Sequence, residues 1–151
     1  MGIAHAQHAP TWMALEPGKT YALPPIQKKP LIFLVAVRGD TLSEPVQVGF
    51  YVLSSPICKA LENPINGPAT GDVGTVGTVY VAGKDFALEG YCDGGNLTLT
   101  PSFWATRKFL FDTIAESDAM SVQFKPGPYL SYQTKGFAHV LADLGLPGPG
   151  R

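Results

Sequence analysis

The sequence predicts a mainly β fold, an antiparallel β-sandwich with one or two short helices that include a C-terminal helix. Glycine and proline are frequent, 17 and 14 of 151 residues, and they separate short apolar segments. Several of these segments alternate apolar and polar residues, as half-buried strands do. Close to the C-terminus the apolar spacing changes to that of a helix. Together these patterns favour many short strands joined by turns over a helical bundle.

Length and composition limit the domain count and the kinds of partner. A chain of 151 residues can form one domain with a substantial core. Charged residues make up 15% of it and the net charge is −1, so we expect no nucleic-acid partner. No apolar run approaches the roughly 20 residues that span a bilayer, so we expect no integral membrane segment. The predicted domain covers residues 9–146, with tails at 1–8 and 147–151.

The C-terminal part shows the clearest order of elements. Val122 and Phe124 alternate with polar neighbours and predict a strand, the Pro- and Gly-rich residues 125–128 predict a turn, and residues 129–133 predict a second strand. Gly145 then marks the end of a predicted helix. Four apolar residues at helical spacing form its buried stripe: Phe137, Val140, Leu141 and Leu144.

Earlier segments predict further strands and one more helix. The expected strands are 18–23, 31–37, 46–53, 75–82, 85–92 and 97–100, and the expected helix is 103–117. The continuous apolar run 31–37 indicates a central strand that is buried on both faces. In the helix, Phe103, Leu110 and Ile114 are expected to share one face.

Residues 54–77 are rich in proline and glycine and predict a long irregular segment. Loops of this length are uncommon in compact domains and are often functional. We therefore expect any partner contact to lie here. The candidate partner-loop residues are Asn63, Pro64, Asn66 and Asp72.

The chain has two cysteines, Cys58 and Cys92. An even number suggests a disulfide in an exported protein. Two buried thiols or a catalytic cysteine are the alternatives. Cysteine catalysis needs a base, usually histidine. His5 and His8 fall in a predicted tail, and His139 lies on the flank of the C-terminal helix.

The N-terminus contains a short pattern related to export. Residues 4–6, Ala-His-Ala, match the small-x-small pattern that precedes a signal-peptidase cut, which would place the mature start near Gln7. The alternative is a disordered cytosolic N-terminus in which the match is accidental. The pattern, the cysteines and the low charge together favour a periplasmic or secreted protein.

Motifs of catalysis and metal binding are missing from the sequence. It contains no HxH, HExxH or CxxC pattern and no GxSxG context for a serine nucleophile. Most acidic residues fall in predicted turns or exposed helix positions, and nothing selects a catalytic pair. We therefore expect no enzyme, with no catalytic, metal-binding or cofactor-binding residues and no cofactor.

The segment FLFDTIAESDAMSVQF, the turn after it and YLSYQTKGFAHVLADLG resemble the C-terminal part of the invasion-associated locus B family of exported alphaproteobacterial proteins. The shared marks are Met120, Val122 and Phe124 in the strand, and residues 135–137 with 141–144 at the helix. Cys92 resembles a cysteine that this family carries ahead of its short helix. The resemblance implies a β-sandwich in the periplasm or at the cell surface, and it carries over no catalytic residues.

These observations predict an exported, non-enzymatic β-sandwich that binds another protein or the cell-envelope surface, and the resemblance adds host interaction as a role. The alternative is a periplasmic inhibitor or immunity protein that blocks a secreted enzyme through loop 54–77. A cytosolic interaction domain with reduced thiols is a third reading. The sequence identifies no particular partner.

Overall fold

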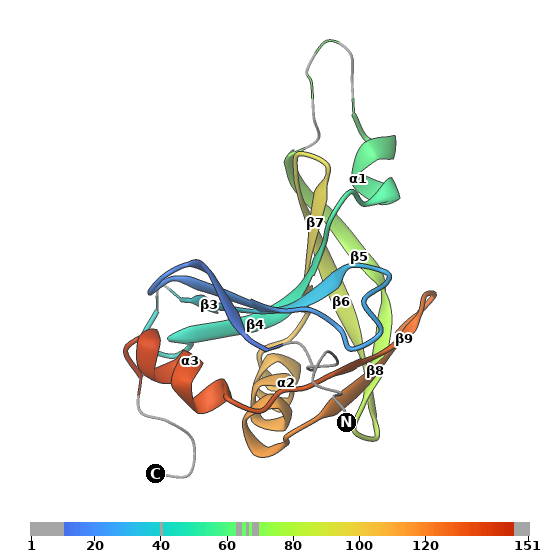
Figure 1. Cartoon of the computed structure of the whole chain (residues 1–151). Helices are drawn as coiled ribbons and strands as arrows, with labels where there is room; N and C mark the ends of the chain where they lie inside the picture. The colour runs from blue at the N-terminus through green and yellow to red at the C-terminus, as the bar shows by residue number, and fades with distance from the viewer. Residues whose placement is uncertain (1–10, 40, 63–64, 66, 68–69, 147–151) are drawn as a thin grey trace, which may run out of the picture.

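The structure is a computed structural model that describes residues 11–39, 41–62, 65, 67 and 70–146 (Figure 1). The elements are β1 (Met13–Glu16), β2 (Thr20–Leu23), β3 (Ile32–Arg38), β4 (Val46–Val52), α1 (Pro56–Ala60), β5 (Thr70–Val81), β6 (Lys84–Asp93), β7 (Asn96–Pro101), α2 (Trp104–Glu116), β8 (Met120–Lys125), β9 (Tyr129–Tyr132) and α3 (Phe137–Asp143). The predicted mainly β, antiparallel fold with a C-terminal helix is confirmed. The described chain has three helices, because α1 adds to the expected one or two.

All nine described strands belong to one sheet in the order β1-β2-β3-β4-β7-β6-β5-β8-β9, and every neighbouring pair is antiparallel. Figure 1 shows β3 and β4 running at a steep angle to β5, β6 and β7. Strands from the two halves of the order, β3–β4 and β8–β9, contact each other across the core. The sandwich layers are therefore parts of one sheet that folds over on itself.

Aromatic residues join the two halves of the sheet. The ring of Phe50 in β4 meets Phe124 of β8 edge-on, with centroids 5.0 Å apart. The hydroxyl of Tyr132 in β9 donates a hydrogen bond of 2.8 Å to the carbonyl oxygen of Ile32 in β3. Burial raises the pKa of this hydroxyl, so it remains a protonated donor. A buried hydrogen bond therefore joins the two apolar halves across the core.

The central strands follow the predicted burial. In β3, Leu34, Val35 and Ala36 are all buried, although successive side chains point to opposite faces. In β4, the residue Gly49 lies against the neighbouring strand β7. A Cβ atom at this position would overlap the carbonyl oxygen of Leu99, so glycine permits the close approach of β7 to β4.

Helices α2 and α3 lie on the same side of β3 and β4, below these strands in Figure 1. Leu110 and Ile114 of α2 are fully buried, and Phe111 packs edge-on against Phe137 of α3 at 5.5 Å. The predicted apolar stripe of α3 is confirmed, since all four of its residues are buried. Phe103 was wrongly expected to share the buried face of α2, because it precedes the first turn and is 69% exposed.

The prediction of an irregular segment from 54 to 77 is wrong in two places. Residues 56–60 form α1, and β5 begins at Thr70 and pairs with β6. The glycines that suggested a loop, Gly71, Gly74 and Gly77, have positive φ angles and accompany two register shifts in this pairing. Glycine at a β-bulge adopts such angles without steric cost, so these residues bend a strand instead of ending it.

Strand β1 was not predicted, because all four of its residues are exposed and no apolar alternation marks it. At the opposite end of the sheet, the connection between β2 and β3 covers the outer side of β9. The backbone N–H of Ile26 donates to the carbonyl oxygen of Ser131, and the Ser131 N–H donates to the Gln27 side chain. The connection therefore occupies hydrogen-bonding groups that an edge strand exposes.

Replacing Tyr132 with phenylalanine is expected to lower the free energy of unfolding by about 1 kcal/mol, because it removes a buried hydrogen bond between the two halves. Equilibrium urea unfolding followed by circular dichroism measures the change. Tyr91→Phe is the matched control, since Tyr91 is 44% exposed and should tolerate the loss of its hydroxyl. Equal losses in the two variants would contradict the assigned role of Tyr132.

Candidate functional site

The partner-loop residues that the sequence predicts are not brought together by the described structure. Asn63, Pro64 and Asn66 lie outside the described residues, as do the predicted tails 1–8 and 147–151. Asp72 lies in β5, exposed and opposite Tyr91 of β6. Its placement in a loop was therefore wrong, because the ladder with β6 extends past it.

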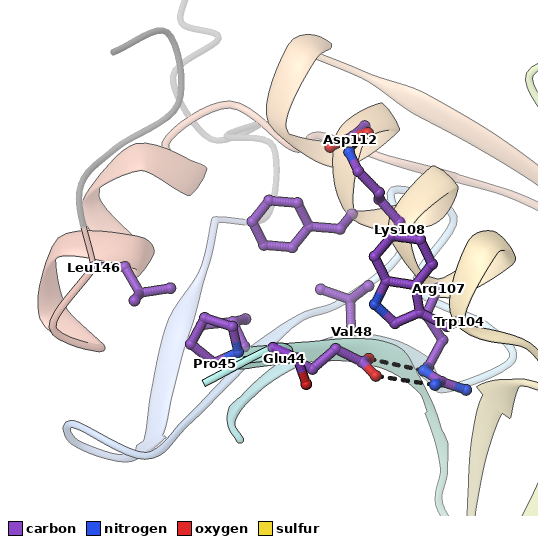
Figure 2. A pocket seen from close by; sticks show the side chains of 11 residues that line it. Glu44, Pro45, Val48, Trp104, Arg107, Lys108, Asp112 and Leu146 are labelled. Carbon is purple, nitrogen blue, oxygen red and sulfur yellow. Dashed lines mark hydrogen bonds and ion pairs between the residues drawn. The ribbon is translucent and has the colours of Figure 1, made fainter. Parts of the chain in front are cut away.

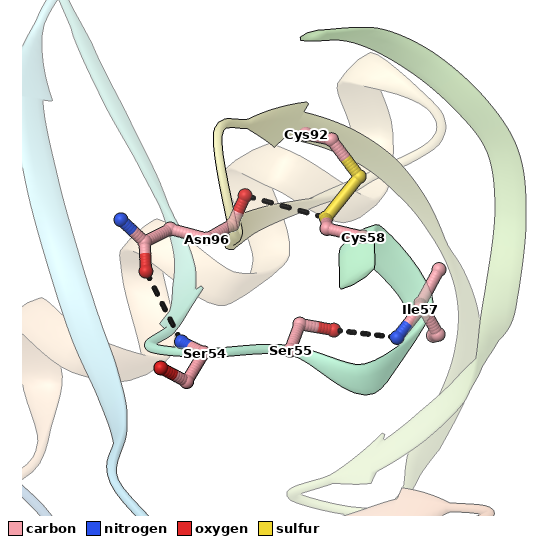
Figure 3. Close-up of a disulfide and its surroundings, with 6 residues drawn as sticks. All are labelled: Ser54, Ser55, Ile57, Cys58, Cys92 and Asn96. Carbon is pink, nitrogen blue, oxygen red and sulfur yellow. Dashed lines mark hydrogen bonds between the residues drawn. A yellow bond between two sulfur atoms is a disulfide. The ribbon is translucent and has the colours of Figure 1, made fainter. Parts of the chain in front are cut away.

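The beginning of the segment after β4 is firmly attached to the sheet. Cys58 of α1 is bonded to Cys92 of β6 and both are buried, so the disulfide among the three sequence readings is confirmed (Figure 3). The N–H of Ser54 donates to the side-chain oxygen of Asn96 at 3.1 Å. Ser55 caps α1 by accepting from the Ile57 N–H. One covalent bond and several hydrogen bonds therefore hold this base.

An apolar hollow of about 240 Å³ lies on the other side of the fold, between α2 and the segment leading into β4 (Figure 2). We call it the Trp104 hollow. Its main lining residues are Pro45, Val48, Trp104, Arg107, Phe111 and Leu146. Hollows of this kind, with apolar walls and a few placed polar groups, are typical of binding sites.

Two aromatic residues stand exposed where α2 begins. Phe103 is 69% exposed and Trp104 is 52% exposed. The side-chain oxygen of Thr106 accepts from the N–H of Phe103 and donates to its carbonyl oxygen, which fixes the first turn. Large apolar side chains that a fixed turn holds in solvent indicate a binding surface, because folding alone would favour their burial.

A bidentate ion pair forms one wall of the hollow. Nε of Arg107 lies 2.7 Å from one carboxylate oxygen of Glu44, and its terminal nitrogen lies 2.9 Å from the other. The Arg107 guanidinium also donates to the carbonyl oxygen of Pro101. The hydrogen bonds to Glu44 raise the pKa of Arg107, and desolvation acts in the opposite direction. The pair joins α2 to the entry of β4 and shapes the hollow.

The ionisable side chains that line the hollow neutralise one another. Lys108 pairs with Asp112 at 2.8 Å, one helical turn further along α2, and Arg107 pairs with Glu44. The described lining contains no histidine or cysteine. In addition, no cluster of three or more His, Cys, Asp or Glu side chains in the described ranges could hold a metal ion. The charges of the hollow are therefore compensated within it, and its other walls are mainly apolar.

Sequence reasoning missed the Trp104 hollow. It assigned no role to Arg107, whose side chain is 24% exposed and bonded to Glu44, 63 positions away. No local pattern marks such a distant pair. The adjacent Phe103 and Trp104 at the start of a helix were the available signal, and the helical period wrongly assigned Phe103 to the core.

No protein-family model matches the chain, and searches of curated proteins and solved structures gave no significant match. Within the described ranges, no helix has the length and apolar character that crossing a membrane requires. The disulfide is of the kind that forms and persists in oxidising compartments.

Replacing both cysteines with serine is expected to lower the free energy of unfolding by about 4 kcal/mol, since the bond closes a loop between residues 34 positions apart. Urea unfolding measures the loss, and the wild-type chain in reductant provides the comparison. A loss below about 1 kcal/mol would show that the hydrogen bonds at the base of α1 hold the segment without the disulfide.

The Glu44–Arg107 pair is expected to show a coupling of about 1 kcal/mol in a double-mutant cycle, because both groups are largely shielded and doubly hydrogen-bonded. The cycle compares Glu44→Gln, Arg107→Met and the double variant by urea unfolding. Lys108–Asp112 is the matched control, an exposed pair on the same helix that should couple much more weakly. Equal coupling in both cycles would contradict a special role for Arg107.

Proposed function

We propose that this chain is an exported, non-enzymatic protein that binds a protein partner of the cell envelope or beyond through the Trp104 hollow. The observation that carries the proposal is the pair of exposed aromatics, Phe103 and Trp104, beside an apolar hollow with a fixed ion-pair wall. Tryptophan and arginine are enriched among residues that dominate binding energy at protein interfaces.

Three features support binding over catalysis. The ionisable groups of the hollow are paired with each other, so their charges are already compensated. Its apolar residues can accept a hydrophobic side chain of a partner. The rim carries charges of both signs, which suits a polypeptide that alternates apolar and charged residues better than a polyanion.

The compartment is part of the same proposal. The buried Cys58–Cys92 bond supports a periplasmic or secreted location, where such bonds persist. Membership of the invasion-associated locus B family, and the host-interaction role it would imply, remain proposals that rest on the sequence resemblance in the last strands and α3.

A second candidate function is inhibition of a secreted enzyme through the segment that follows α1. It is favoured by the firm attachment of α1 to the sheet. Cys58 of α1 forms a disulfide with Cys92 of β6, and Ser54, just before α1, donates a hydrogen bond to Asn96 of β7. Inhibitory loops bind tightly when their bases are held in place, because less conformational entropy is lost on binding.

Site-specific photo-crosslinking in the source cell tests the proposal and separates the two candidates. A photoreactive residue in place of Lys108, at the rim of the hollow, is expected to form an adduct with one protein. Trp104→Ala should lower the adduct yield about tenfold or more, while Tyr91→Ala, an exposed aromatic on β6, should leave it unchanged.

An adduct that is insensitive to Trp104→Ala would contradict binding through the hollow. If a photoreactive residue in place of the 92% exposed Ile65 forms the adduct instead, and a Gly-Ser replacement of residues 63–69 abolishes it, the inhibitor reading is supported. Circular dichroism and urea unfolding of each variant confirm that the fold is retained.

A further inference from the structure

Two exposed tyrosines lie in one row on the outer face of the sheet, away from the Trp104 hollow. Tyr80 of β5 is 44% exposed and Tyr129 of β9 is 60% exposed. Tyr80 pairs with Gln123 of β8, and Gln123 pairs with Tyr129, so all three side chains share one face. Two strand spacings separate the tyrosines, which is about 10 Å.

The residue between the tyrosines leaves the row open. The side-chain amide of Gln123 donates to the carbonyl oxygens of Phe124 and Gly127, at 2.8 and 3.1 Å. The amide is thereby turned toward the β8–β9 hairpin. The two tyrosine side chains accordingly flank a position, Gln123, whose side chain does not stand up between them.

A lysine ammonium group packs against one face of the Tyr80 ring. The ammonium group of Lys125 lies 5.3 Å from the ring centroid and is held by Asp85 at 2.8 Å. Lys125 of β8 pairs with Thr78, which comes two residues before Tyr80 in β5. Ser121 comes just before Val122, the partner of Val81, so it lies on the opposite side of Tyr80 along the strands. One face of the ring is therefore in contact with Lys125, and the other face points toward Ser121.

A hollow of about 310 Å³ occupies that open side, and both tyrosines line it. Thr113, Ser117 and Ser121 also line it, and none of its described lining residues is charged. The Thr113 hydroxyl donates to the carbonyl oxygen of Phe109, and the Ser121 hydroxyl shares a hydrogen bond with Ser131, so both keep oxygen lone pairs that can accept from a ligand. Hydroxyls both donate and accept hydrogen bonds, as sugar hydroxyls do. Aromatic faces carry negative electrostatic potential and attract the weakly positive C–H groups of a pyranose ring.

We infer that Tyr80, Tyr129 and the hollow beside them form a binding site for a neutral saccharide, an extended β-1,4-linked pyranose chain that crosses β5, β8 and β9. In such a chain alternate rings present the same face, at a spacing close to the separation of the two tyrosines. The absence of charge among the described lining residues favours a neutral ligand over an acidic polysaccharide or a phosphate. The site shares no described lining residue with the Trp104 hollow and does not depend on the proposed protein partner.

Titration of the full chain with N-acetylchitohexaose, followed by NMR shifts and isothermal calorimetry, tests the site. We expect a dissociation constant at or below about 1 mM. Tyr80→Ala and Tyr129→Ala should each weaken binding about tenfold, because each removes one stacking ring. Tyr129→Trp should retain binding, while Tyr91→Ala and Trp104→Ala should leave it unchanged. Retention in Trp104→Ala separates this site from the protein-binding proposal.

Maltohexaose, with α-1,4 links and a coiled chain, is the matched ligand control and should bind much more weakly. Equal binding of both sugars would overturn the extended-chain geometry. Failure of N-acetylchitohexaose to bind at millimolar concentration, or binding that neither tyrosine variant weakens, would overturn the site. Urea unfolding of both alanine variants checks that their fold is intact.

Discussion

The fold depends on contact between two halves of one sheet that are distant in strand order. A sheet of nine strands with one apolar face is stable only when that face is covered. Here β8 and β9 cover β3 and β4 through the edge-on contact of Phe50 with Phe124 and through the buried hydroxyl of Tyr132. The close approach of β7 to β4 at Gly49 brings the backbones together where the strand direction changes. Helix α2 then fills the remaining apolar space with Leu110 and Ile114.

This closure determines what remains on the surface. Because α2 turns its apolar face inward, the residues of its first turn project outward beside the entry to β4, and Trp104 stands over a hollow there. Because β5, β8 and β9 face the core with Val79, Val122 and Leu130, their alternate residues form an outer row with two tyrosines. Both candidate binding surfaces are thus the outward sides of elements whose inward sides hold the fold together.

Local periodicity predicted most elements, because an element that is buried on one face has apolar residues at a regular spacing in the sequence. The α3 stripe and the alternating residues of β4 are examples. Strand β1 shows no such pattern, since all four of its residues are exposed. Glycines of β5 were taken for loop residues although they serve β-bulges. The Ser55 cap and Pro56 at the start of α1 were a usable helix signal that the expected loop obscured. Both candidate hollows join residues from separate elements, which no local pattern reveals.

We propose that this disulfide-bonded chain is exported and presents rigid binding surfaces, and the bond between α1 and β6 connects its fold to its compartment. The most direct test is the intact mass of the protein purified from its own host, with free thiols alkylated before and after reduction. We expect Cys58 and Cys92 to be alkylated only after reduction and the mass to correspond to a start near Gln7. Alkylation of both cysteines without reductant, on a chain that retains its N-terminal residues, would contradict export and favour a cytosolic protein.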